Sequence, residues 1–149
     1  MSLEKDINQH KFRNQQQKSI INIIYSYNWL MERIKKLVAE EGITPQQFNM
    51  LRILRGSFPI PISTLQIRDR MLDKMSDTSR IVDRLILKGM VQKSVSNADK
   101  RLVDVLITPA GQETLARLDA KNNEMDKILS SLDENEMTQL NVLLDKIRG

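Results

Sequence analysis

The chain has 149 residues, enough for one domain with a buried core, and its formal charge of +4 permits anionic partners. It contains no cysteine and one histidine, His10, which excludes disulfides, thiol chemistry and a multi-histidine metal site within one chain. No apolar run could span a bilayer and no signal peptide is recognisable, so we expect a soluble, cytoplasmic protein without a membrane partner.

Residues 19–39 predict one long helix, because apolar side chains recur at steps of four and three. The stripe consists of Ile20, Ile24, Tyr27, Met31, Ile34 and Val38. Ile21, Trp29, Leu30 and Leu37 widen it, so we expect this helix to be buried on more than one side. Gly42 is predicted to end it.

Two shorter helices are predicted next. Thr44-Pro45 supplies an N-cap and a proline at the first helical position of a helix that stops at Gly56. The segment "FPIPIS" allows only a short edge strand. Ser63 with Gln66 forms a capping box, which begins a third helix that runs to about Leu72.

The stretch "MSDTSRIVDRLILKGM" predicts a fourth helix, whose inner face carries Ile81, Val82, Leu85 and Ile86. Gly89 is placed to end it in a left-handed conformation. Alternating residues over 91–95 and the stretch "SNADKRLVDVLIT" then predict a β-hairpin.

Two helices complete the chain. A long helix from Thr108 is predicted to carry a heptad stripe, and a last helix follows "SLDENE". The first stripe comprises Leu115, Leu118, Asn122, Met125, Leu129 and Leu132, and the second Met137, Leu140, Leu144 and Ile147.

This order predicts a mostly α fold with a small β-hairpin wing, which is the order of a winged helix-turn-helix. We expect residues 43–111 to form the DNA-binding module. Residues 1–42 and 112–149 would form a helical dimerisation region, intertwined with the module as one domain. The basic excess agrees, since residues 1–107 carry it and residues 108–149 have a net charge of −3.

The fourth helix has the properties of a recognition helix, because short polar side chains and arginines lie opposite its apolar face. Its candidate DNA contacts are Ser76, Asp77, Ser79, Arg80 and Arg84. The alternative is that Arg80 and Arg84 only form surface ion pairs with Asp77 and Asp83.

The hairpin tip carries Asp99, Lys100 and Arg101. In a winged module this tip reaches toward a minor groove, where an arginine is favoured. Asp99 would hold the guanidinium extended, and Lys100 would meet a phosphate. A solvated turn in which Asp99 and Arg101 merely pair is the alternative.

"DKRLVDVLIT" followed by "PAG" resembles the wing signature of the MarR family of bacterial transcriptional regulators, and "SDTSRIVDRLILKGMV" is similar to its recognition helix. The resemblance covers residues 44–111. Ile107 replaces the usual leucine, and the acidic Asp77 departs from the pattern near the helix start. The resemblance implies a homodimer that binds double-stranded DNA at a near-palindromic operator, most often as a repressor.

The apolar stripes at the two ends of the chain agree with a dimer, because they exceed what the small module can cover. We expect the dimer contacts at Ile20, Ile24, Tyr27, Met31, Leu129, Leu132, Leu140 and Leu144, with Asn122 setting the register. An intramolecular core is the alternative for these stripes.

The resemblance also implies a small-molecule effector in many members. Tyr25 and Trp29 are candidates for lining its pocket, although side chains at this spacing are more often core. We expect no metal, no other cofactor and no enzymatic activity, since no nucleophile motif or phosphate loop is present. A helical adaptor whose winged module does not bind DNA is the alternative function.

Overall fold

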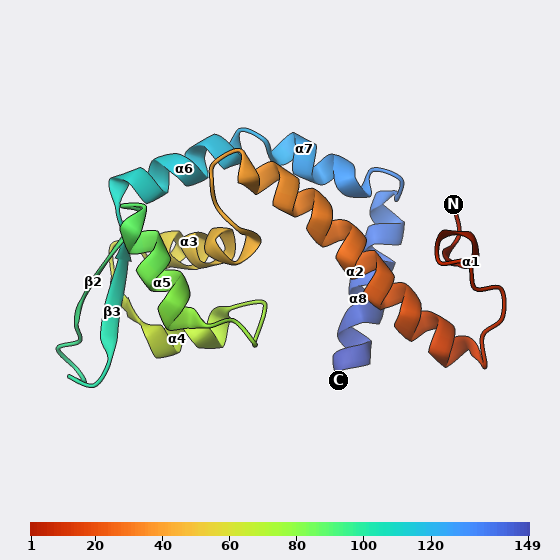
Figure 1. The fold of residues 1–149 in the computed structure, drawn as a ribbon, viewed down its shortest axis with the longest axis horizontal. Helices are drawn as coiled ribbons and strands as arrows, with labels where there is room; N and C mark the ends of the chain where they lie inside the picture. Colours follow the sequence, from red (N-terminus) through yellow and green to blue (C-terminus); the bar gives the residue numbers. More distant parts are fainter.

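The computed structural model describes all of residues 1–149 and confirms the predicted class, mostly helical with one small antiparallel sheet (Figure 1). In chain order the elements are α1 (Leu3–Asp6), α2 (Gln15–Ala39), α3 (Pro45–Ser57), β1 (Ile62–Ser63), α4 (Thr64–Arg70), α5 (Thr78–Leu87), β2 (Val91–Val95), β3 (Val103–Ile107), α6 (Pro109–Asp119), α7 (Asn122–Asp126), the 3₁₀ turn η1 (Lys127–Leu129) and α8 (Glu134–Arg148). No helix combines the length and apolarity needed to cross a lipid bilayer.

Side-chain caps fix where the helices begin. Ser63 and Gln66 form the predicted capping box, with the Gln66 backbone N–H donating to Ser63 Oγ at 3.2 Å. Thr44 forms a second box with Gln47, which the sequence analysis did not anticipate. The helix predicted over 19–39 begins four residues earlier, because Asn14 accepts a hydrogen bond from the Gln17 backbone N–H.

The sheet has the order β1-β3-β2. Strands β2 and β3 form the predicted hairpin, in a register that pairs Val91 with Ile107 and Val95 with Val103. The two-residue strand β1 adds to the other edge of β3 and is the short edge strand that the prolines before it predict. The hairpin is therefore anchored to the helices at its root, while its tip projects away from them (Figure 1).

One hydrophobic core of 15 buried residues holds residues 38–118 together. It includes Met50, Leu51 and Leu54 of α3, Val82 and Leu85 of α5, and strand residues. Val38, Leu115 and Leu118 join this core from the helices that flank the module. The core thus extends beyond residues 43–111 to the end of α2 and to the whole of α6.

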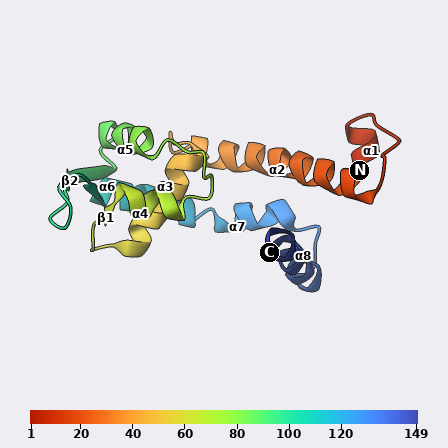
Figure 2. The same ribbon diagram turned by 90° about the horizontal axis from the view of Figure 1, so that it is seen from below.

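Apart from Val38 at the end of α2, the N-terminal arm (α1 and α2) and the C-terminal arm (α7, η1 and α8) lie outside this core. Figure 2 shows α2 running away from the module, with α7 and α8 on one side of it. Neither α7 nor α8 has a buried residue, and Val38 is the only one in α2.

The continuous helix predicted from Thr108 to Leu132 is wrong. Helix α6 ends at Asp119, and the chain turns at Lys121 before α7 begins at Asn122 (Figure 1). The Lys121 side chain forms an ion pair with Glu40 at this turn, and the polar residues 121–124 separate Leu118 from Met125 in the apolar stripe. Asn122 is therefore an exposed first residue of α7, not a polar position within an unbroken stripe.

Candidate nucleic-acid interface

Helix α5 is held by one face and exposes the other. Thr78, Val82 and Leu85 are buried, whereas Ser79, Arg80 and Arg84 are exposed. Gly89, with a φ of +72°, follows the helix and lets the chain turn into β2. The predicted division between an inner and an outer face of α5 is confirmed.

Two of the candidate DNA-contacting residues, Ser76 and Asp77, do not lie on the exposed face of α5 as predicted. Asp77 is the N-cap of α5, where its carboxylate accepts a hydrogen bond from the Arg80 backbone N–H at 3.1 Å. Ser76 precedes the helix, so it cannot share the helix's exposed face as the sequence analysis expected. The hydroxyl oxygens of Ser76 and Thr78 are buried without a hydrogen-bond partner.

The arginines of α5 are not used in surface ion pairs, which contradicts that alternative. Asp77 caps the helix, and Asp83 pairs instead with Lys93 of β2, at 3.0 Å between Nζ and Oδ1. Arg80 and Arg84 have no ion-pair partner, so both guanidinium groups are available on the outer face of α5.

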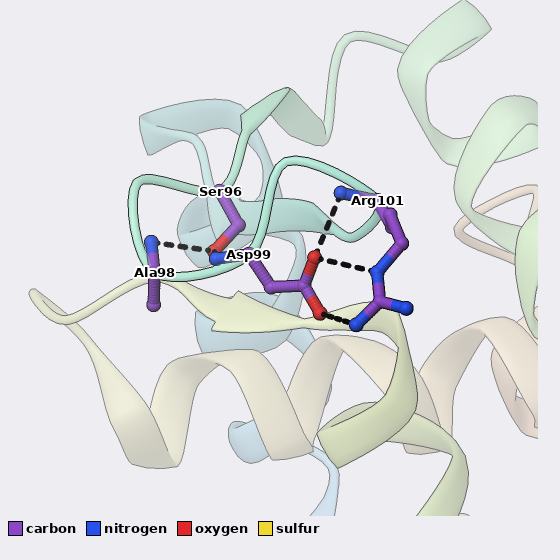
Figure 3. A network of polar contacts seen from close by, with 4 residues as sticks. All are labelled: Ser96, Ala98, Asp99 and Arg101. Atoms are coloured by element: carbon purple, nitrogen blue, oxygen red, sulfur yellow. Dashed lines mark hydrogen bonds and ion pairs between the residues drawn. The ribbon is translucent and has the colours of Figure 1, made fainter.

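The turn between β2 and β3 is organised by Ser96, which is buried. Its hydroxyl oxygen accepts hydrogen bonds from the backbone N–H groups of Ala98 and Asp99 (Figure 3). Its own backbone N–H donates to the carbonyl of Leu102 at 3.1 Å. This serine holds the tip in a defined loop, and nothing in the hairpin pattern singled it out.

Arg101 lies at the tip with 89% of its side chain exposed. Its Nε and Nη2 donate to the two carboxylate oxygens of Asp99 at 3.1 and 2.9 Å, and its backbone N–H also donates to Asp99 (Figure 3). These hydrogen bonds hold the pKa of the Asp99 carboxyl below its ordinary value and raise the pKa of the Arg101 guanidinium. The predicted pairing of the two side chains is confirmed.

The pair with Asp99 leaves N–H donors of the Arg101 guanidinium available for a further hydrogen-bond acceptor. A guanidinium has five N–H donors, and two of them bond to Asp99, so three remain. Lys100, beside it, is exposed and has no ion-pair partner. The tip therefore presents a guanidinium held by Asp99 and an unpaired ammonium.

The root of the hairpin is built on Gly111, in the first turn of α6. A Cβ at this position would lie 2.3 Å from the Met90 carbonyl oxygen and 2.8 Å from the Ile107 side chain. Thr108 completes the joint, because its hydroxyl donates to the Gly89 carbonyl at 2.6 Å. The "TPAG" segment thus fixes the position of the hairpin relative to α5. A glycine in the first turn of a helix was the signal for this role in the sequence.

One cavity lies where α2 meets the module, and another lies between the two arms. The first, of about 500 Å³, is lined by Ala39, Gly42, Ile43, Thr44, Gln47, Arg84, Leu87 and Lys88. The second, of about 520 Å³, lies between α2 and the C-terminal arm and is lined by Leu30, Ile34, Met125, Asp126, Ile128, Leu129, Ser130, Leu132 and Met137. Tyr25 and Trp29 line neither cavity.

The stripes predicted to dimerise are largely uncovered in the single chain. On α2 the side chains of Ile20, Ile24 and Tyr27 are exposed, and Met31 is half-buried. In the C-terminal arm Leu129 and Leu140 are exposed, whereas Leu132 and Leu144 are half-buried. The module does not cover these surfaces.

Comparison with known proteins agrees with this geometry. The family model described as MarR family matches residues 43–103. The HTH-type transcriptional repressor MdtR of Bacillus subtilis is 31% identical over 104 residues, which are 67% of this chain and 64% of MdtR. The HTH-type transcriptional regulator PecS of Dickeya dadantii is 26% identical over 131 residues, 86% of this chain and 79% of PecS.

Solved structures show the same fold. A putative MarR-like transcription regulator from Bacillus cereus matches with a TM-score of 0.80 at 21% identity, over 90% of this chain and 96% of its own. BpsR of Bordetella bronchiseptica, whose DNA binding is regulated by 6-hydroxynicotinic acid, matches with a TM-score of 0.75 at 18% identity, over 89% and 99% of the two chains.

Proposed function

This chain belongs to the MarR family, and from that premise we propose that it is a sequence-specific DNA-binding transcriptional regulator, most simply a repressor. The observation that carries the proposal is the unpaired state of Arg80 and Arg84 on the exposed face of α5, beside a hairpin whose tip carries Arg101. Unpaired guanidinium groups on an exposed helix can donate two bonds to guanine or bind phosphates.

In this proposal α5 enters the major groove, and the hairpin is a wing that places Arg101 in the neighbouring minor groove. Asp99 holds the guanidinium in one orientation, which lowers the conformational entropy that the arginine loses on binding. The three N–H groups that Asp99 does not use are left for base edges and sugars. Ser79 and Lys100 are placed to meet phosphates.

We also propose that two chains bind a near-palindromic operator together. The exposed stripes of α2 and α8 would pack against their copies in a second chain, so that two modules are held at a fixed distance. Two half-sites related by a dyad would then be bound at once.

A small-molecule effector would have a place in the cavity between the ends of α2 and α5. Arg84 lines this cavity and also lies on the outer face of α5. A molecule bound there would therefore contact a residue that the DNA needs and would release the protein from its operator.

Selection of binding sites from a random duplex pool tests the proposal, with wild type and Arg101→Ala compared at near-physiological salt. We expect the wild type to enrich a two-fold-symmetric site and Arg101→Ala to bind it about ten- to a hundredfold more weakly. Arg148→Ala is the matched control, because Arg148 also pairs with a nearby aspartate but lies at the far end of α8. If the wild type enriches no site, the adaptor function gains the support that DNA binding loses.

The salt dependence of binding supplies a second test. Each phosphate neutralised by an arginine or lysine releases counterions, so the affinity of the wild type should fall steeply between 50 and 200 mM salt (on the order of 10³-fold for six contacts). An affinity that does not change with salt would contradict direct contact with the DNA backbone.

A further inference from the structure

Asp83 places a negative charge on the helix face that carries Arg80 and Arg84. Its side chain is 61% exposed and faces out of the module beside β2. Lys93, from the first strand of the hairpin, donates to the Asp83 carboxylate at 3.0 Å. This ion pair joins α5 to the hairpin.

An unpaired carboxylate at this position would oppose DNA binding in two ways. It would repel the phosphates that α5 approaches, because the charges are alike. It would also attract Arg80, which lies three residues earlier on the helix, at a spacing where side chains of opposite charge pair. Arg80 held by Asp83 would no longer be free for a base edge.

We propose that Lys93 is a positioning residue for DNA recognition, which occupies the Asp83 carboxylate so that Arg80 and Arg84 stay unpaired. This inference rests on the proposed function. Lys93 also links β2 to the middle of α5. Its effect on DNA binding is exerted through Asp83 and requires no contact between Lys93 and DNA.

A direct contact between the Lys93 ammonium and a phosphate is the competing role, since the side chain is 49% exposed. The two roles differ in what happens when Asp83 loses its charge. A positioning lysine becomes dispensable once Asp83 is neutral. A lysine that contacts a phosphate remains necessary, and its loss lowers the number of counterions released on binding by about one.

The experiment is a double-mutant cycle on the full-length protein, with the duplex selected by the wild type and with binding measured at several salt concentrations. The variants are Lys93→Met, Asp83→Asn, the two together, and Lys93→Arg. Lys36→Met is the matched control, because it removes a lysine from an exposed ion pair with Glu32 on α2. Thermal unfolding of each variant verifies that the module is folded.

We expect Lys93→Met to weaken operator binding about tenfold, and Asp83→Asn in the same chain to restore it to within about twofold of the wild type. Lys93→Arg should bind like the wild type, because it keeps the pair, and Lys36→Met should have no effect. The salt dependence of the double variant should equal that of the wild type.

Two results would overturn the inference while leaving the proposed function intact. One is equal weakening by Lys93→Met in both backgrounds with a reduced salt dependence, which is the signature of a phosphate contact. The other is no weakening at all. If the wild type binds no duplex, the proposed function itself fails, and this outcome is separate from the first two.

Discussion

The winged module and the two helical arms bury their apolar side chains differently. The module covers its own core, in which residues such as Leu51 and Leu85 are fully buried. The arms expose theirs, and Ile24 on α2 and Leu143 on α8 are more than half exposed. Since water-exposed apolar surface is costly, a partner surface that covers these side chains would stabilise the arms, whereas the winged module already buries its own apolar residues. A second copy of the chain supplies that surface in our proposal.

A charge on the α2 stripe should produce the largest effect. Ile24→Glu would place a carboxylate in the proposed dimer interface, where desolvation without a partner is unfavourable. We expect a monomer by light scattering and operator binding more than about a hundredfold weaker, because one module contacts only one half-site. Ser26→Glu, which adds the same charge at an exposed polar position of α2, should leave the dimer intact. A dimer that survives Ile24→Glu would contradict the role of this stripe.

A cavity in the module core should produce the next largest effect. Leu51 is fully buried, so Leu51→Ala should lower the free energy of unfolding by about 2–5 kcal/mol. Leu65→Ala, at a half-exposed position of α4, should change it by less than about 0.5 kcal/mol. Urea unfolding measures both. Equal losses in the two variants would show that the module does not have the core described here.

Two glycines of the module should respond in opposite directions to the same substitution. Gly111→Ala would force a methyl group against the Met90 carbonyl and should destabilise by about 1–3 kcal/mol. A methyl group at Gly56, within α3, would point into open space. Gly56→Ala should therefore raise the free energy of unfolding by about 0.5–1 kcal/mol, because alanine favours a helix. Thermal unfolding of both variants measures these changes. A shift of the melting temperature in the same direction in both would contradict the close packing at the hairpin root.

The smallest effect concerns the contact by which α1 folds back on α2. The Lys18 ammonium lowers the pKa of the Glu4 carboxyl from 4.5 to about 2. A lowered folded-state pKa means that the pair stabilises α1 fully above pH 4.5 and that this contribution is lost as the pH falls from 4.5 toward 2. A carboxyl titration by NMR should place the Glu4 midpoint near 2 and, in Lys18→Met, close to its ordinary value. An ordinary midpoint in the wild type would show that α1 does not dock on α2 in solution.

The sequence predicted what depends on local signals. The capping residues, the alternation of the hairpin and the apolar face of α5 all depend on residues close together in the chain. Their patterns can therefore be recognised from the sequence alone. The same holds for the pair of Asp99 and Arg101, two residues apart.

The features that the sequence did not reveal depend on partners far along the chain. Helix α6 ends at Asp119 and Lys121 after it pairs with the distant Glu40, although the heptad spacing continues past this point. The alternative interpretation of α5 pairs Asp83 with an arginine of its own helix, whereas its partner is Lys93 of β2. Ser76 was placed on the helix because the pattern does not show that Asp77 is the cap. The apolar stripes of the arms follow from local spacing, but the surface proposed to cover them belongs to a second chain and leaves no pattern in the sequence.

In our proposal the arms join two chains so that two modules bind one operator. Sedimentation velocity of the wild type with the selected duplex tests it most directly, since the mass of the complex counts the chains. We expect a dimer in the free protein and two chains on one duplex. A monomeric protein that binds the duplex as a single chain, or a dimer that forms no complex with it, would contradict the proposed assembly.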